Sequence, residues 1–139
     1  MRLAVVDTGA LYAAADEDDQ EHEACVRALE RPDLRLVIPA MVVAEATYLI
    51  GARLGATVES NFLETLAQFD VRVPRGSDWL RIAQLVYEYR GLPLGGTDAS
   101  VIALAEILGT PTLVTVDRRD FRVVRPRHCE AFELLPDEV

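Results

Sequence analysis

The sequence predicts an α/β fold in which helices cover both faces of a central parallel sheet. Short apolar runs that fit buried strands occur at Leu3–Val6, Leu36–Ile38, Val71–Val73, Thr112–Val116 and Ala131–Leu135. Segments with helical spacing of apolar residues lie between most of these runs, and such alternation is typical of a parallel sheet. The 139 residues contain no linker, repeat or low-complexity segment. We therefore expect one domain that spans residues 1–139.

Helices are expected where apolar residues recur three and four positions apart. Three of them cover residues 10–14, 20–30 and 40–53. The fourth is expected to be capped by Thr57, the fifth by Ser77 or Asp78, and the sixth to open at Thr97 and Asp98. The expected buried stripes are Val58, Phe62, Leu63, Leu66 and Phe69 in the fourth helix, Trp79, Ile82, Ala83, Val86 and Tyr89 in the fifth, and Val101, Ile102, Ala105 and Leu108 in the sixth.

The composition excludes several kinds of chemistry. The net charge of −9 is unlike that of a general nucleic-acid coat protein. All 14 basic residues are arginine, so a phosphate-loop lysine, a Schiff base and a lysine general base are absent. The chain also lacks a G-x-S-x-G nucleophile motif and a C-x-x-C pair. Carboxylates remain as the candidates for catalysis.

No apolar run is long enough to span a membrane, and the segment Leu3–Val6 fits a strand better than a signal peptide. The expectation is a cytoplasmic protein without membrane association.

Three aspartates occupy positions where ligands gather in a parallel sheet. Asp7 ends the first expected strand and Asp117 ends the fourth, so both should border the crevice at the carboxyl edge. Asp98 lies in the first turn of a buried helix, behind a glycine-rich loop, where the helix dipole should keep it ionised. Each aspartate has an alternative role as a simple cap, because Asp favours turns and helix starts.

Glu45 is the one charged residue between Arg35 and Arg53, inside a mostly apolar helix. A carboxylate among apolar neighbours is rarely buried unless it is paired or bound to a metal. This favours a functional role, and the alternative is that Glu45 occupies the solvent-facing side of the helix together with Thr47 and Tyr48.

Four carboxylates in one crevice would repel one another, and a divalent cation among them would relieve that repulsion. Oxygen ligands without Cys or His select Mg²⁺, with Mn²⁺ as the second candidate. Such metals assist phosphodiester hydrolysis.

Four segments that contain these carboxylates resemble the motifs of PIN-domain nucleases, and most closely those of VapC-type toxins. They are residues 5–11 (VVDTGAL), 43–45 (VAE), 97–99 (TDA) and 113–121 (LVTVDRRDF). The resemblance covers nearly the whole chain, and the first and last motifs are the more specific ones. It implies a three-layer α/β/α fold of the PIN or Rossmann-like kind and a Mg²⁺-dependent endoribonuclease. It also implies a cognate antitoxin as partner and a homodimer.

The resemblance also implies roles for individual residues. The family's acidic quartet would be matched by Asp7, Glu45, Asp98 and Asp117, with Asp7 and Asp98 as the main metal ligands. Thr8 and Thr115 match hydroxyl positions that orient the carboxylates or a water, and Asp120 could supplement Asp117. Gly9 departs from the pattern, because many relatives have serine there.

Arginines cluster from Asp117 onward, within the last motif and after it, namely Arg118, Arg119, Arg122, Arg125 and Arg127. They could bind substrate phosphates through bidentate hydrogen bonds, or they could only balance an acidic surface.

Two other interpretations compete with a magnesium nuclease. His22 and Cys25, with His128 and Cys129, could form a zinc site, although adjacent ligands depart from the usual zinc spacing. The same fold could also act as a non-catalytic scaffold that binds RNA or protein.

Overall fold

The computed structural model, which describes residues 1–137, contains a five-stranded parallel sheet as the sequence predicts. The strand order is β3-β2-β1-β4-β5, and Val5 of β1 is level with Val37 of β2 and Leu113 of β4. The order of the strands reverses between β1 and β4, so a crevice opens beyond their carboxyl ends. The strands are β1 (Arg2–Val6), β2 (Leu34–Pro39), β3 (Asp70–Arg72), β4 (Thr112–Val114) and β5 (Glu133–Leu135).

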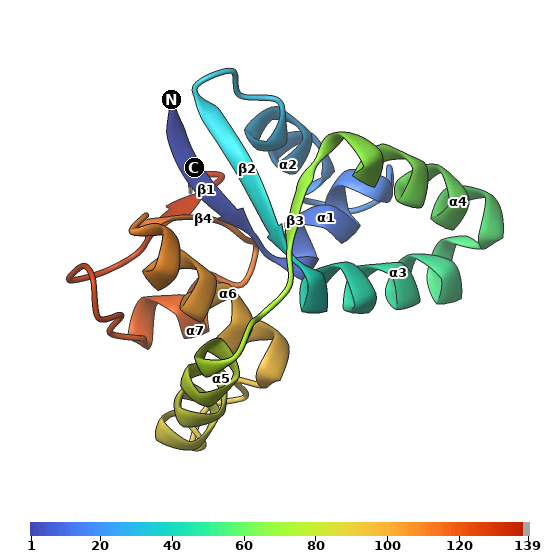
Figure 1. Cartoon of the computed structure of the whole chain (residues 1–139). Coiled ribbons are helices and arrows are strands. Elements are labelled where there is room, and N and C mark those ends of the chain that lie inside the picture. Colours follow the sequence, from blue (N-terminus) through green and yellow to red (C-terminus); the bar gives the residue numbers. More distant parts are fainter. Residues whose placement is uncertain (138–139) are drawn as a thin grey trace.

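Helices cover both faces of the sheet, which confirms the three-layer α/β/α architecture. Figure 1 shows α1 to α4 on one side of the sheet and α5 to α7 on the other. None of the helices within residues 1–137 is both long and apolar enough to cross a membrane. The helices are α1 (Thr8–Ala15), α2 (His22–Leu29), α3 (Ala40–Leu54), α4 (Ala56–Thr65) with the short 3₁₀ helix η1 (Leu66–Gln68), α5 (Ser77–Glu88), α6 (Gly96–Leu108) and α7 (Arg118–Val123).

The core lies where α6 packs over the central strands. Val5 and Val6 of β1 are fully buried, as are Val101, Ile102 and Ala105 of α6, as predicted. The apolar surface of α6 keeps the helix against the sheet, because removing that surface from water is the main favourable term in folding. The helix therefore begins at the carboxyl edge of the sheet, where Met41 of α3 lies close to Gly96.

Two predicted helix caps are wrong in position. Gly55, with φ of +92°, precedes α4, so Thr57 lies within the first turn and does not cap it. Gly76, with φ of +47°, precedes α5 in the same way. A glycine adopts this backbone conformation without steric penalty, so the chain can turn sharply into each helix. Asp78 still contributes, because its Oδ2 accepts a hydrogen bond from the backbone N–H of Arg75 at 2.9 Å.

The predicted buried stripes are correct only in part. Ile82 is buried, as predicted, but Leu85 completes the buried face of α5, whereas Trp79 is 47% exposed and Ala83 is exposed. In α4, Leu63 is likewise exposed. Both helices lie at the outside of the molecule, so each buries a narrower face than its apolar pattern suggests.

The segment after β4 differs from the prediction. β4 ends at Val114, two residues early, and α7 was not predicted. Thr115 continues to donate its N–H to Leu135 at 2.8 Å, although it is outside the strand. Asp117 precedes the first residue of α7, and Asp120 lies in its first turn.

A close contact between α1 and the segment after β4 gives a test of the packing. A Cβ added at Gly9 would lie 2.5 Å from Val116 Cγ2. We expect Gly9→Ala to destabilise the protein by about 1–2 kcal/mol, because overpacking outweighs the gain in helix propensity. In a Val116→Ala background the same change should be neutral or stabilising. Urea unfolding of the four variants of this cycle measures the coupling, and a purely additive cycle would contradict the contact.

Candidate active site at the carboxyl edge of the sheet

Asp7 anchors the candidate site at the end of β1. Its backbone N–H donates to the carbonyl of Val114 at 2.9 Å, which continues the hydrogen bonding between β1 and β4. Its side chain is buried, and Thr115 Oγ1 donates to Asp7 Oδ2 at 2.9 Å. The same hydroxyl oxygen accepts the backbone N–H of Asp117 at 3.0 Å. Thr115 therefore links the Asp7 carboxylate to the backbone that carries Asp117.

Burial raises the pKa of Asp7 from its ordinary value of 3.8 to about 6. Loss of hydration is the largest cause, and the hydrogen bonds from the Thr8 backbone and from Thr115 oppose it. The negative charges of Asp117 and Glu45 raise the pKa further. The surroundings of Asp7 therefore disfavour the ionised form of its carboxyl group.

Asp98 lies in the first turn of α6 and is half-buried. Its pKa is raised to about 7, first by loss of hydration and then by the charges of four other carboxylates. Burial and repulsion therefore disfavour the ionised form of Asp98 by more than the helix dipole favours it, since the dipole contributes about 1 kcal/mol. The four carboxylates, in order of their effect, are Asp7, Asp117, Glu45 and Asp120.

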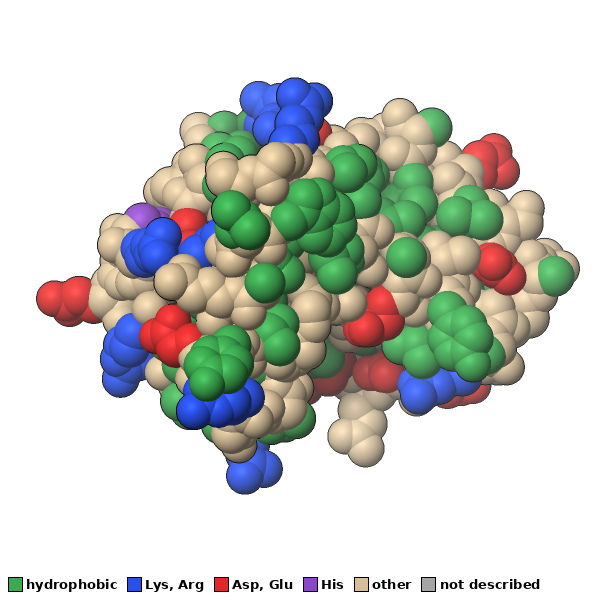
Figure 2. Space-filling model, turned by 60° about the horizontal axis from the view of Figure 1, so that its bottom comes forward, with side chains coloured by type: hydrophobic (Ala, Val, Ile, Leu, Met, Phe, Trp, Pro, Cys, Tyr) green, Lys and Arg blue, Asp and Glu red, His purple; other side chains and the backbone are tan. Residues whose placement is uncertain are grey.

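Glu45 is exposed on α3, together with Ala44 and Tyr48. Glu45 thus lies on the solvent-facing side of α3 together with Tyr48, as one of the two interpretations expected, and its functional role stays a prediction. Its charge nevertheless raises the pKa of both Asp7 and Asp98. Glu45 is thus part of the same electrostatic cluster, on its solvent side. Figure 2 shows acidic side chains near the middle of this face, beside a hollow in the surface.

Asp117 and Asp120 enter the cluster from α7. Asp117 is half-buried, and its pKa is raised by loss of hydration and by the charge of Asp120, while a hydrogen bond from the Asp120 backbone opposes this. Asp120 itself is buried. Because an N-cap residue and a residue three positions later both lie at the start of a helix, α7 brings two carboxylates to the crevice.

Two buried polar atoms in this corner have no hydrogen-bond partner in the structure, namely Asp7 Oδ1 and Thr8 Oγ1. Buried polar groups normally have a partner, so an unsatisfied carboxylate oxygen fits a site that takes a cation or a water. Within residues 1–137, no three carboxylate, His or Cys side chains are already arranged to hold a metal ion. The oxygen donors suit a hard cation in their chemistry, but their side chains do not form a preassembled metal site.

The residues of the zinc alternative make other contacts in the structure. His22 Nδ1 lies 2.7 Å from the carbonyl of Ala13, and His128 Nε2 lies 2.7 Å from the carbonyl of Thr110. Both imidazoles thus bind backbone, and Cys25 belongs to the core.

The arginines after β4 are not equivalent. Arg118 Nη1 lies 3.4 Å from Glu21 Oε1, and its Nη2 donates to the carbonyl of Pro136 at 3.2 Å. Arg118 therefore ties α7 to the segment before α2 and to the end of the chain. Arg119 and Arg122 are exposed. Of these three arginines, Arg119 and Arg122 have the more accessible side chains.

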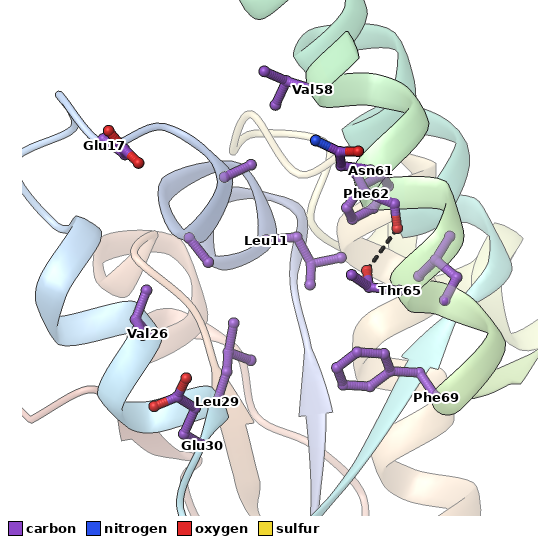
Figure 3. A pocket seen from close by; sticks show the side chains of 13 residues that line it. Leu11, Glu17, Val26, Leu29, Glu30, Val58, Asn61, Phe62, Thr65 and Phe69 are labelled. Atoms are coloured by element: carbon purple, nitrogen blue, oxygen red, sulfur yellow. Dashed lines mark hydrogen bonds between the residues drawn. The ribbon is translucent and has the colours of Figure 1, made fainter.

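A second feature, which the sequence analysis missed, is an apolar groove of about 510 Å³ between α1, α2 and α4. Figure 3 shows Leu11, Leu29 and Phe69 around it, with Glu17 and Glu30 at its edge. None of the candidate carboxylates lines it. The apolar residues of α2 and α4 carried the signal, but they were assigned wholly to the core. The groove is an exposed apolar surface, which is the usual mark of a binding surface.

Comparisons with known proteins agree with this geometry. The family model of the PIN domain matches residues 4–125. Ribonuclease VapC26 of Mycobacterium tuberculosis is 31% identical over 134 residues, which are 95% of this chain and 99% of that protein.

Two solved structures share the fold. The crystal structure of M. tuberculosis VapC20, a sarcin–ricin loop cleaving toxin, superposes with a TM-score of 0.76 at 16% identity over 84% of this chain and 91% of that one. VapBC2 of Rickettsia felis, bound to a DNA fragment from its promoter, gives a TM-score of 0.69 at 18% identity over 95% and 98%.

The raised pKa values predict how stability depends on pH in metal-free buffer. A carboxyl group whose pKa is higher in the folded than in the unfolded protein makes the folded state bind more protons, so stability falls as pH rises from about 4 to 7. Asp98→Asn should remove part of this pH-dependent loss of stability. We expect the variant to be more stable than the wild type at pH 8, by on the order of 1–2 kcal/mol after allowance for solvent screening, and to differ little near pH 4.

Urea unfolding in EDTA at several pH values measures this effect. Glu130→Gln, at an exposed glutamate outside the cluster, is the matched control and should follow the wild type. A variant Asp98→Asn that is less stable than the wild type at pH 8 would show that Asp98 is not strained by its neighbours.

Proposed function

Because this chain belongs to the PIN-domain family, we propose that it is a Mg²⁺-dependent endoribonuclease that hydrolyses RNA phosphodiester bonds and acts as the toxin of a toxin–antitoxin pair. Its relative over almost the full length is a ribonuclease, which supports the substrate class. The single observation that carries the proposal is the group of carboxylates around the buried Asp7, whose charges raise the pKa of Asp7 and of Asp98.

The carboxylates fit a hard divalent cation. Asp7 and Asp98 would bind it directly, since one has an unpartnered buried oxygen and the pKa of the other is raised by the cluster's other carboxylates. Glu45 on α3 and Asp117 at the start of α7 would be the remaining ligands of the ion. Oxygen donors without a Cys or His favour Mg²⁺, with Mn²⁺ as a substitute. When bound, such an ion would supply the positive charge that polarises a phosphate oxygen and activates a water.

The chain's own residues contribute orientation and charge. Thr115 holds one oxygen of Asp7 by its hydrogen bond, which leaves the other oxygen, Oδ1, directed away from that bond. The buried hydroxyl of Thr8 is available to hold a water or a phosphate oxygen. Arg119 and Arg122 would balance the phosphates of the strand. In the overall reaction, water adds to phosphorus, the bond to one ribose oxygen breaks, and that oxygen takes up a proton.

Cleavage of total cellular RNA by the purified chain, with Mg²⁺ or Mn²⁺ and with EDTA, tests the catalytic proposal. We expect metal-dependent fragments from the wild type, and a loss of about 100-fold or more in Asp98→Asn, because a metal ligand would be removed. Glu130→Gln should cleave normally. RNA binding without cleavage in either metal would contradict the nuclease and favour a non-catalytic scaffold of the same fold.

We assign the apolar groove to the antitoxin partner. Its lining is apolar, and Glu17 and Glu30 stand at its edge beside the acidic segment 16–19. An amphipathic helix with apolar residues on one face and basic residues at its borders would match both properties. Occupation of this surface leaves the carboxylates themselves uncovered, so such a helix would need an extension to block the site.

A genetic experiment tests this assignment. Fragments of the source genome that rescue a host from growth arrest by this chain would identify the antitoxin gene. We expect Val58→Arg, at a half-buried position of the groove, to escape rescue while it still cleaves RNA, because a basic partner would be repelled. Ile107→Arg, which is 57% exposed and outside the groove, should be rescued like the wild type. Equal rescue of both variants would place the antitoxin elsewhere.

The homodimer that the resemblance implies and the cytoplasmic location expected from the sequence stay predictions.

A further inference from the structure

Tyr87 and Arg90 form a stacked pair at the C-terminal end of α5. The Arg90 guanidinium carbon lies 4.1 Å from the centre of the Tyr87 ring, and Nη1 of Arg90 donates to the carbonyl of Tyr87 at 2.8 Å. The ring is 67% exposed and Arg90 is exposed too. The hydrogen bond keeps the planar guanidinium over the ring, so the pair is ordered before any ligand arrives. Neither residue was predicted from the sequence to bind a ligand, although the spacing Tyr-x-x-Arg at a helix end is compatible with such a stack.

The pair lies at the same end of the molecule as Asp98. Arg81 of α5 binds Glu106 of α6 through two hydrogen bonds of 2.8 and 2.9 Å, and this sets the alignment of the two helices. The helices are antiparallel and joined by residues 89–95. Tyr87 is six residues beyond Arg81, and Ser100 is six residues before Glu106. Because each helix rises about 1.5 Å per residue, Tyr87 and Ser100 lie at about the same height along the pair of helices. Tyr87 is thus level with a residue two positions beyond Asp98 in α6, and Arg90 follows the end of α5, in the connection that leads to α6.

A second contact fixes the position of the end of α5. Tyr89 Oη, two residues from Tyr87, accepts the backbone N–H of Arg125 at 2.9 Å, which ties the end of α5 to the segment that follows α7. The end of α5 is thus linked to the segment that follows α7, and residues 89–95 join it to the start of α6.

An acidic nuclease needs a way to hold RNA that does not depend on net charge. The chain carries a charge of −9, and at least seven arginines are already paired with carboxylates. Within residues 1–137 Arg90 is in no such ion pair, and its contacts are to Tyr87. Stacking of a base on an aromatic ring or a guanidinium plane contributes about 1–3 kcal/mol per base and tolerates any base.

We propose that the Tyr87–Arg90 pair binds an unstacked nucleobase of the RNA substrate next to the cleavage site, while the free edge of the guanidinium meets the adjoining phosphate. This rests on the proposed ribonuclease function and specifies its substrate. A base within a duplex is stacked on its neighbours and cannot reach the pair, so the substrate is a single-stranded segment or a loop. Tyr87 and Arg90 are thus substrate-positioning residues, separate from the carboxylates.

Binding of a short fluorescent single-stranded oligoribonucleotide of mixed sequence, measured by anisotropy in EDTA, tests the pair without turnover. We expect Tyr87→Ala to weaken binding by about 10-fold or more, and Tyr87→Phe, which keeps the ring, to bind like the wild type. Arg90→Ala should also weaken binding. Trp79→Ala and Arg75→Ala, an exposed aromatic and an exposed arginine at the other end of α5, are the matched controls and should have no effect.

Unchanged binding in Tyr87→Ala, or no binding by the wild type, would overturn the inference. A loss of self-association in Tyr87→Ala, seen by sedimentation without a loss of RNA binding, would also overturn it and make the pair a protein contact.

A cleavage assay with Mg²⁺ separates this inference from the proposed function. Cleavage with an unchanged KM in Tyr87→Ala would overturn the role of the pair and leave the nuclease intact. Binding that depends on Tyr87, with no cleavage in any metal, would support the pair and overturn the nuclease. A raised KM with kcat within about twofold is the result that both proposals require.

Discussion

The charge of Asp7, buried at the end of β1, is the constraint on which the rest of the site depends. Its backbone completes the bonding of β1 to β4, so the side chain cannot move toward water without disturbing the centre of the sheet. Thr115 donates a hydrogen bond to Oδ2 of Asp7, and Oδ1 of Asp7 has no hydrogen-bond partner in the structure. The neighbouring carboxylates add repulsion to the loss of hydration. The protein thus holds a local strain that a bound cation would release, as is common where stability is given up for function.

The helices contribute to this site in different ways. α6 is buried along its length, and its packing brings Asp98 into a poorly hydrated corner where burial and repulsion outweigh the helix dipole. α3 presents Glu45 to solvent, so this carboxylate adds charge while it keeps its own hydration. α7 is short, but it brings both Asp117 and Asp120 to the crevice. The candidate carboxylates therefore occupy environments that range from buried to exposed.

The surface is divided in a way that suits a regulated nuclease. The carboxylates lie at the carboxyl edge of the sheet, the apolar groove lies between α1, α2 and α4, and the stacked tyrosine and arginine lie at the end of α5. Among residues 1–137, none of the candidate carboxylates lines the groove. The proposed partner surface and the proposed substrate site are therefore separate, and α1 connects them because Asp7 precedes its first residue and Leu11 lines the groove.

The sequence by itself determined the alternation of strands and helices, the parallel sheet and the position of Asp7 at the end of β1, because these follow from local apolar patterns and from the geometry of parallel strands. It also identified Asp98 and Glu45 as members of the cluster. Only the tertiary structure decided that Glu45 is exposed, that Trp79 and Leu63 do not belong to the core, and that Arg118 is held by Glu21 and Pro136. The groove and the alignment of Tyr87 with Ser100 were likewise set by helix packing. Burial, pKa and exposed surface depend on which elements cover a residue, and that is a property of contacts between segments far apart in the chain.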